Sequence, residues 1–244
     1  MEQPEAGRPA DPAADLPRIV RVHPPIWQEL VIDLFFRPGR FFADQVTLWQ
    51  TRYVVAVCWV YGMATAIDKF DEQILKAGLN PRRPNVAEIL GPLTQSWTWY
   101  WTYVLAYGAL CGLFLWWIGG WWYRIRLIWS GAVNADVRLA RLVYIYASFV
   151  AAAPSVIYAL IQTATSPNYN VASDAAGLGS VVLLLFPFWS LFTSYRGVRT
   201  LFEVSRWKAR LWFVILPGLV YAFALAAFVV LLLLVPELQG AGQG

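Results

Sequence analysis

Five apolar stretches that contain no Asp, Glu, Lys or Arg constrain this 244-residue chain more than any other feature. They cover residues 53–67, 97–119, 142–162, 178–195 and 212–235. A helix needs about 20 apolar residues to cross roughly 30 Å of hydrocarbon. Four stretches reach or approach that length, whereas the first needs anchoring from residues 49–52 and Phe70 on its flanks. The pattern predicts an all-α polytopic membrane protein with five transmembrane helices.

The composition agrees with lipid rather than water as the solvent. Hydrophobic residues make up 59% of the chain and charged residues 14%, and the mean hydropathy is +0.50. A soluble globule of this size would need more polar surface than such a chain can supply. The pI of about 9.1 comes from cations in short loops, where they meet anionic lipid headgroups, so nucleic acid is not an expected partner.

Fifteen of the nineteen Lys and Arg residues fall on one predicted side of the membrane. Six precede the first stretch, four lie between the second and third, and five lie between the fourth and fifth. By the positive-inside rule, the N-terminus and both basic loops are expected in the cytoplasm of a cell whose inner or plasma membrane holds the protein. The C-terminus, with a short tail over residues 236–244, is then expected outside.

The region before the first stretch divides into two parts. Residues 1–25 are rich in Pro, Ala and charge, and we expect a disordered cytoplasmic tail. Residues 26–36 place Leu30, Val31, Leu34 and Phe35 on one helical side, and Pro38-Gly39 should end that helix. The opposite, polar side carries Gln28, Glu29 and Asp33. This helix is expected to lie in the headgroup plane, or equally to pack on the ends of the spans.

Small residues and prolines carry the packing information within the stretches. Gly108 and Gly112 form a Gly-x-x-x-Gly motif that favours close approach of helix backbones, either inside one chain or between copies in a homo-oligomer. Pro154, Pro187 and Pro217 are expected to kink the third, fourth and fifth helices. Residues 68–96 are expected to form a solvated connector with two short helices, the second ending at Gly91-Pro92.

The sequence offers no catalytic, metal or cofactor motif. The single histidine, His23, lies in the predicted tail, and the two cysteines lie inside stretches where a packing role is expected. The stretches hold no ionisable Asp, Glu, Lys, Arg or His of the kind that marks a transport pathway. A non-enzymatic protein is therefore predicted. A permease or channel component that uses the Pro-kinked third to fifth helices is the alternative, and it predicts a polar cavity lined by hydroxyl groups.

Two short segments next to the stretches are the candidate contacts with anionic headgroups or with a membrane or cytoplasmic protein partner. One precedes the first stretch and the other follows the fourth, and their residues are Arg37, Pro38, Phe41, Phe42, Arg196, Arg199, Arg206 and Lys208.

The same segments carry a family resemblance. Arg37-Pro38-x-x-Phe41-Phe42 before the first stretch, and Trp189 followed by Tyr195-Arg196-Gly197-Val198-Arg199, resemble the Yip family of Ypt/Rab-interacting membrane proteins in its short bacterial form. The resemblance covers residues 26–235 and implies a five-span membrane domain that acts as a scaffold in membrane organisation or trafficking. Eukaryotic members carry Asp-Leu-Tyr-Gly-Pro where this chain has Asp33-Leu34-Phe35-Phe36-Arg37-Pro38, which argues against a Rab-type GTPase contact.

Overall fold

The computed structural model describes residues 27–45, 53–79, 84–174 and 178–241, and all secondary structure in those ranges is helical. The predicted tail over residues 1–25 lies outside them. The N-terminal part forms α1 (Trp27–Phe36), α2 (Pro38–Arg40) and the π-helical turn η1 (Phe41–Gln45). The long helices and their connectors follow as α4 (Val54–Leu79), α5 (Pro84–Gln95), α6 (Trp97–Trp129), α7 (Val137–Thr165), α8 (Tyr169–Asp174), α9 (Leu178–Leu183), α10 (Phe186–Leu201), α11 (Arg206–Arg210), η2 (Leu211–Ile215) and α12 (Leu216–Ala241).

Four helical segments among the described residues are long and apolar enough to cross a membrane. They are Trp97–Trp129, Val137–Thr165, Val181–Leu201 and Arg206–Ala227. The predicted first span is not among them. Its helix α4 is 26 residues long, but only fourteen uncharged residues precede Asp68, the first of five charged residues between Asp68 and Lys76. Four apolar helices indicate a membrane protein.

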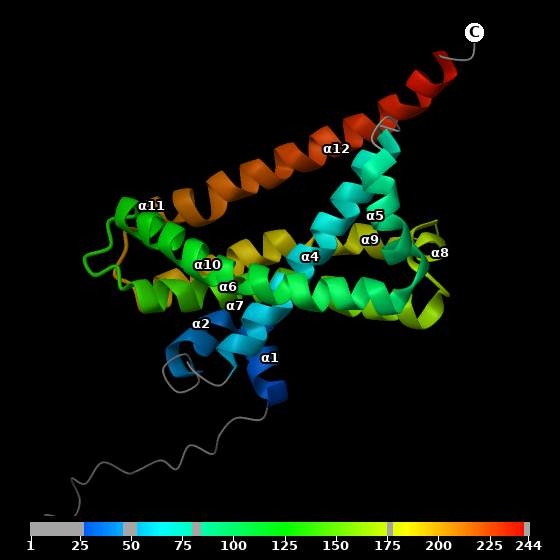
Figure 1. Ribbon diagram of the computed structural model, residues 1–244. Helices are drawn as coiled ribbons and strands as arrows, with labels where there is room; N and C mark the ends of the chain where they lie inside the picture. Colours follow the sequence, from blue (N-terminus) through cyan, green and yellow to red (C-terminus); the bar gives the residue numbers. More distant parts are fainter. Residues whose placement is uncertain (1–26, 46–52, 80–83, 175–177, 242–244) are drawn as a thin grey trace, which may run out of the picture.

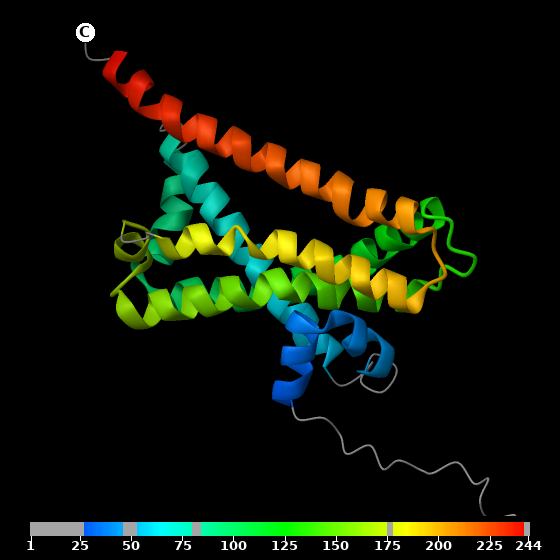
Figure 2. The ribbon, with the colours of Figure 1, turned by 180° about the vertical axis from the view of Figure 1, so that it is seen from behind.

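The long helices run in alternating directions through one bundle (Figures 1 and 2). Helices α6, α7 and α10 lie nearly parallel to one another, and α4 crosses them obliquely. The loop between α6 and α7 and the connection between α10 and α11 share one end of the bundle, which we call the basic end. Helices α5 and α8 cover the opposite end.

The backbones of α4 and α6 touch where they cross. A Cβ atom built on Gly108 would lie 2.9 Å from the backbone of Met63, and one on Gly62 would overlap the carbonyl of Gly108. Gly112 is equally close to the carbonyl of Cys58. Because lipid provides no hydrophobic drive between spans, such close contact is a main source of helix association in membranes. The Gly-x-x-x-Gly motif is thus used inside the chain.

Two of the three expected proline kinks coincide with irregular backbone. A turn at Leu184–Leu185 separates α9 from α10 just before Pro187, and η2 precedes Pro217. Pro154 instead lies within the continuous helix α7. The connector differs from the prediction too, since α5 runs through Gly91-Pro92 to Gln95 rather than ending there. Pro92 is tolerated because the flanking residues keep their helical bonds.

Helix α12 diverges from the bundle along most of its length (Figure 2). Its first turns contact η2 and α10, whereas Leu219, Val220 and Phe223 are exposed, the last by 78%. The small residues Ala222 and Ala226 are exposed as well, so no described helix packs closely on them. Residues 236–241, predicted as a tail, continue α12, and the last three residues lie outside the described part.

Replacement of Gly108 by Ala tests the α4–α6 crossing. The added methyl must push the α4 backbone away, so we expect a loss of about 1–3 kcal/mol of stability, the usual cost of overpacking. Thermal unfolding of the purified protein in detergent measures this.

The matched control is Gly91→Ala, because a Cβ on Gly91 meets nothing within 4 Å. That variant should be as stable as the parent or slightly more stable. Equal melting temperatures for the two variants would contradict a tight crossing.

Candidate lipid and partner contact site

Residues 27–45, which we call the N-terminal hook, dock on the bundle beside α7 and α10. Helix α1 reaches the bundle with its C-terminal end, and α2 and η1 then follow the surface toward the basic end (Figure 1). Leu30 and Leu34 of α1 are buried, whereas Ile32 and Phe36 are exposed. Asp33 was expected on the polar face, yet it is buried, and Arg40 lies 3.9 Å from its carboxylate. The hook therefore packs on the helices with one face and leaves another apolar face free.

The two motifs that carry the family resemblance lie against each other. A Cβ atom on Gly197 of α10 would meet the ring of Phe42 at 2.7 Å, and one on Gly39 would lie 3.9 Å from the hydroxyl of Thr200. Phe42 is fully buried, and its neighbour Phe41 packs edge-on against Tyr146 of α7 with ring centroids 5.0 Å apart. Gly197 is needed because any side chain there would displace the Phe42 ring.

A hydrogen bond fixes the end of α1. The indole Nε1 of Trp189 in α10 donates to the carbonyl of Phe35 over 2.8 Å. That carbonyl belongs to the last turn of α1, where four carbonyls lack helical partners. Trp189 therefore both caps α1 and holds it against α10.

The predicted contact residues divide into buried and accessible sets. Pro38, Phe41 and Phe42 are buried against the bundle, so their side chains serve internal packing. Arg37, Arg196, Arg206 and Lys208 are exposed, and Arg199 is half-buried. The guanidinium of Arg196 stacks over the ring of Phe192 at 5.2 Å. The accessible part of the candidate site is thus a set of cations around the hook and α11.

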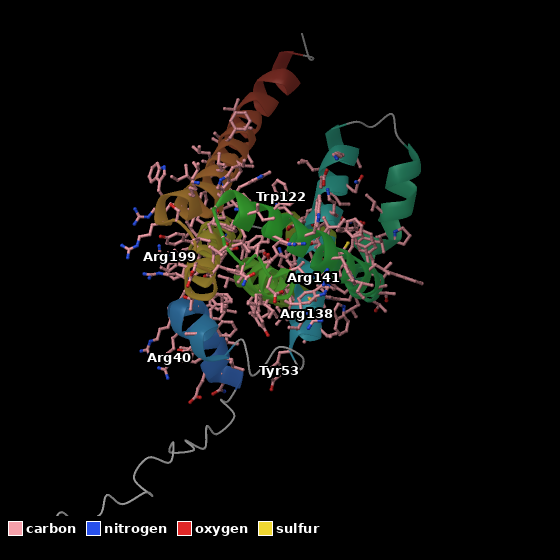
Figure 3. All side chains as sticks on the ribbon, turned by 90° about the vertical axis from the view of Figure 1, so that its left-hand side faces the viewer. Arg40, Tyr53, Trp122, Arg138, Arg141 and Arg199 are labelled. Atoms are coloured by element: carbon pink, nitrogen blue, oxygen red, sulfur yellow. The ribbon has the colours of Figure 1, made fainter. Side chains whose placement is uncertain are left out.

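These cations belong to a larger basic end that is tied together by backbone contacts. The amide of Ser205, between α10 and α11, donates to the carbonyl of Ser130 after α6 over 3.4 Å. Figure 3 views the molecule from this end, with Arg40, Arg138, Arg141 and Arg199 labelled. Arg141 stacks over Trp117 with 4.2 Å between guanidinium and ring. The charge asymmetry of the sequence therefore coincides with one physical end of the bundle.

Arg126 is an exception among these cations, because it is only 9% exposed. It lies in α6 between the rings of Tyr123 and Phe213, 5.0 and 4.4 Å from their centroids. Its guanidinium donates to the carbonyl of Trp212 in η2, and no acidic side chain of the described residues lies within 4.0 Å. In a π-helical turn the carbonyl of residue i accepts from the amide of residue i+5, which for Trp212 is Pro217 and has no N–H, so the guanidinium satisfies that carbonyl. Arg126 joins α6 to the start of α12.

The opposite end is closed by aromatic and acidic side chains. Phe70, Tyr100 and Tyr169 pack ring against ring, with Phe70 and Tyr169 centroids 5.0 Å apart, and the hydroxyl of Tyr169 donates to Asp71 over 2.6 Å. Partial burial, together with the nearby charge of Asp71, raises the pKa of Asp68 to about 6. The ammonium groups of Lys69 and Lys76 lower the pKa of Glu72 to about 2. Fixed negative charge thus faces away from the basic end.

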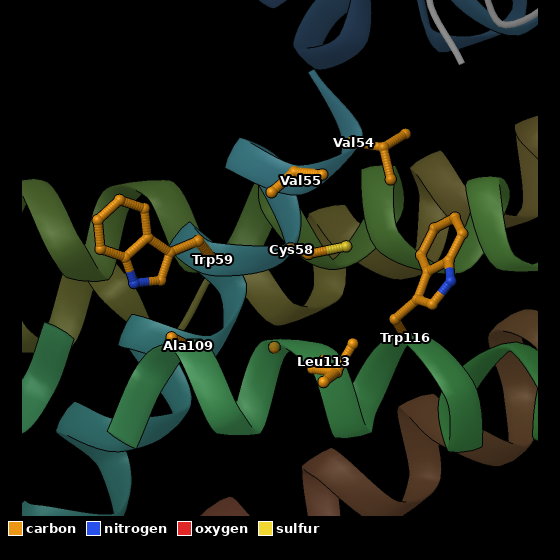
Figure 4. Close-up of a pocket in the computed structure, with 8 residues that line it drawn as sticks. Val54, Val55, Cys58, Trp59, Ala109, Leu113 and Trp116 are labelled. Carbon is orange, nitrogen blue, oxygen red and sulfur yellow. The ribbon is translucent and has the colours of Figure 1, made fainter. Parts of the chain in front are cut away.

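Three cavities in the described part of the chain have apolar walls. One, of about 480 Å³, lies between α4 and α6 beside the glycine crossing (Figure 4). Val54, Cys58 and Trp59 line it from α4, and Leu113 and Trp116 from α6. The second, of about 740 Å³, lies beside α7, and the third, of about 230 Å³, lies between α10 and α12. None of the three offers the polar lining that a pathway for a charged solute requires.

Several hydroxyl groups in the bundle bond to their own helix. Thr102 donates to the carbonyl of Thr98 over 2.8 Å, and Ser155 donates to that of Ala151 over 3.4 Å. Thr65 and Thr163 follow the same pattern. Such back-bonding satisfies a hydroxyl without water. It weighs against the water-accessible cavity that the permease alternative predicts.

Sequence reasoning missed the residues that connect distant helices. Arg126 was counted with the loop cations, although α6 continues to Trp129 and buries it. The hydrogen bonds between Tyr61 and Tyr144 and between Tyr123 and Ser194 were not expected either. Only the helical spacing of Tyr123 and Arg126 hints at a shared face. Among the described residues, His, Cys, Asp and Glu form no group of three that could hold a metal.

Comparison with known proteins found no matching family model, no matching curated protein and no matching solved structure.

Replacement of Gly197 by Ala tests the docking of the hook. The methyl would meet the Phe42 ring, so η1 and α2 should detach partly from α10, and the amides of residues 39–42 should lose protection in hydrogen–deuterium exchange. Gly218→Ala is the matched control, since its methyl would meet only Leu191 at an ordinary 3.7 Å. Unchanged exchange in Gly197→Ala would mean that this contact does not hold the hook.

Proposed function

We propose that the chain crosses the membrane five times and serves as a non-enzymatic scaffold or adaptor of the Yip type. In this proposal α4 is the first crossing, α2 and η1 lie toward the cytoplasmic headgroups while α1 packs against α7 deeper in the membrane, and the basic end contacts anionic lipids or a protein partner. The membrane is the inner or plasma membrane of the cell. Membrane organisation or trafficking is the process to which such a scaffold belongs.

The observation that carries the proposal is the pairing of the hook with the basic end. Exposed cations of α2, α10 and α11 surround a docked segment whose own free face carries Ile32 and Phe36, exposed by 53% and 72%. An apolar face next to cations suits a segment at the cytoplasmic boundary of a membrane, where apolar side chains enter the acyl region and guanidinium groups meet phosphates. This arrangement supports contact with a surface rather than passage of a solute.

The packing of α4 supports a fifth crossing. Val57, Ala64, Ala66 and Ile67 of α4 are buried against the bundle, and Gly62 touches α6 at backbone distance. At 1.5 Å per residue, the uncharged part of α4 from Val54 to Ile67 extends about 21 Å. A crossing by α4 therefore relies on anchoring at its ends, where long side chains such as Lys69 can reach the headgroups.

Reporter fusions separate five crossings from four. With five, reporters attached before Met1 and after Asn134 share the cytoplasm, and a reporter after Gly244 lies outside, because the cations then remain inside. With four crossings, the reporter before Met1 would lie on the side of the membrane opposite to the reporter after Asn134. Enzymatic reporters that are active in only one compartment measure this, and a cytoplasmic reporter after Gly244 would contradict the orientation.

Photocrosslinking in native membranes tests the adaptor role. A benzoylphenylalanine at Arg206 should form a protein adduct of one discrete mass, whereas the same residue at Trp99, exposed at the opposite end, should not. Changing Arg196, Arg199 and Lys208 to Gln in the same chain should abolish the adduct, because the partner is held by charge.

Two results would count against this role. Adducts with lipid alone at Arg206 would reduce the basic end to a membrane anchor. A protein adduct that survives loss of the three charges would show that the cations do not recognise the partner.

A further inference from the structure

The cavity of about 740 Å³ is a groove beside α7, on the side of the bundle where the hook docks. Helix α7 contributes a wall from Phe149 to Ile161, which lie twelve residues apart and therefore about 18 Å apart along its axis. The other wall comes from Gly179, Val182 and Leu183 of α9 and Phe186 of α10. The groove therefore runs along the helices, in the direction that acyl chains take in a bilayer.

The floor of this groove is a tight helix contact. A Cβ atom on Gly179 would lie 2.7 Å from the ring of Tyr158, so α9 touches α7 there. Ile157, Ile161 and Val182 remain exposed by more than half of their side-chain surface. The cavity is thus a furrow that opens sideways, toward the lipid of the proposed membrane.

The hook closes one end of the furrow. Val31 and Phe35 of α1 line it, and the hydrogen bond from Trp189 to the Phe35 carbonyl holds α1 in place. Beyond α1, Phe41 and Phe42 fill the surface between α7 and α10 that would otherwise continue the furrow. The open part consequently lies between α1 and the end of the bundle that carries α8.

We propose that this furrow binds one acyl chain of a membrane lipid whose headgroup lies at the end opposite to the basic loops. The chain lies along α7, and its terminal methyl group abuts Val31 and Phe35. The inference depends on the membrane insertion in the proposed function, not on the adaptor role. It assigns α1 a second contact, the end of a lipid tail.

The dimensions favour an acyl chain over a protein helix. Half of the hydrocarbon layer is about 15 Å thick, close to the furrow's length of about 18 Å. A transmembrane helix of a partner or of a second copy needs about 30 Å of clear surface, and α1 blocks it halfway. An acyl chain cannot enter from the basic end either, because Phe41 and Phe42 occupy that part of the surface.

Phospholipids with a photoreactive diazirine in one acyl chain test the orientation. The intact protein is reconstituted in vesicles of these lipids, illuminated and mapped by peptide mass spectrometry. A diazirine near the terminal methyl should label residues 31–35 and Phe149, and one near the ester should label Ile161 or residues 179–182. The reverse order of labelling would overturn the proposal. So would labelling of exposed α6 residues such as Leu110 and Phe114 to the same extent as the furrow residues.

A matched pair of variants tests the binding. Ala153→Phe places a ring in the furrow and should lower the labelling of residues 31–35 by roughly tenfold. Ala106→Phe adds the same ring at an exposed position of α6 and should leave it unchanged. Equal labelling in both variants would overturn the proposal.

Retention of lipid gives an independent readout. Native mass spectrometry of the detergent-purified chain should show one bound lipid per copy, and Ala153→Phe should remove it. If the Ala153→Phe variant retained the lipid, the furrow would not be the lipid's binding site, whereas the proposed function would be unaffected. Recovery of the chain in the soluble fraction without detergent would overturn both.

Discussion

The backbone contact between α4 and α6 is the constraint on which the remaining structure depends. Gly62, Gly108 and Gly112 allow two helices to approach more closely than any side chain would permit. Once α4 is held obliquely against α6, its free side meets α7, and both hydrophobic clusters form around these three helices. In lipid, where burial of apolar surface gives little drive, such dispersion contacts decide which helices associate.

Polar groups then distinguish the two ends of the bundle. At the basic end, guanidinium groups stack on aromatic rings or extend outward, as Arg141 and Arg196 do. At the other end, carboxylates and tyrosines form a compact cluster around Phe70. Arg126 belongs to neither arrangement, since its charge lies within the bundle and is neutralised by no carboxylate of the described residues. Its cost is offset by two aromatic faces and a carbonyl, which is how a guanidinium is accommodated in apolar surroundings.

Whether a feature could be predicted from the sequence depended on how far apart in the chain the interacting residues lie. The all-helical fold, the second to fifth apolar helices, the break before Pro187 and the close contact of Gly108 and Gly112 follow from local pattern, and the structure has them. The length of α5 and the burial of Asp33 did not follow, because neighbours distant in sequence decide them. For the candidate site, the sequence drew attention to the two segments, but it indicated neither that they pack against each other nor that Phe41 and Phe42 face inward. Exposure on a docked segment depends on the partner surface, here Gly197 and Tyr146, which no local pattern specifies.

The attachment of α12 at one end only has a mechanical consequence. Two contacts hold the segment that leads into α12: Arg126 donates to the carbonyl of Trp212, and the rings of Trp129 and Trp212 lie 4.5 Å apart. The middle of α12, in contrast, is largely exposed. An arm of 26 residues is about 39 Å long, so a pivot of about 10° at its base would sweep its tip through about 7 Å. Small rearrangements of the side chains that hold the start of α12 would therefore produce a much larger displacement of its far end, near the opposite membrane surface.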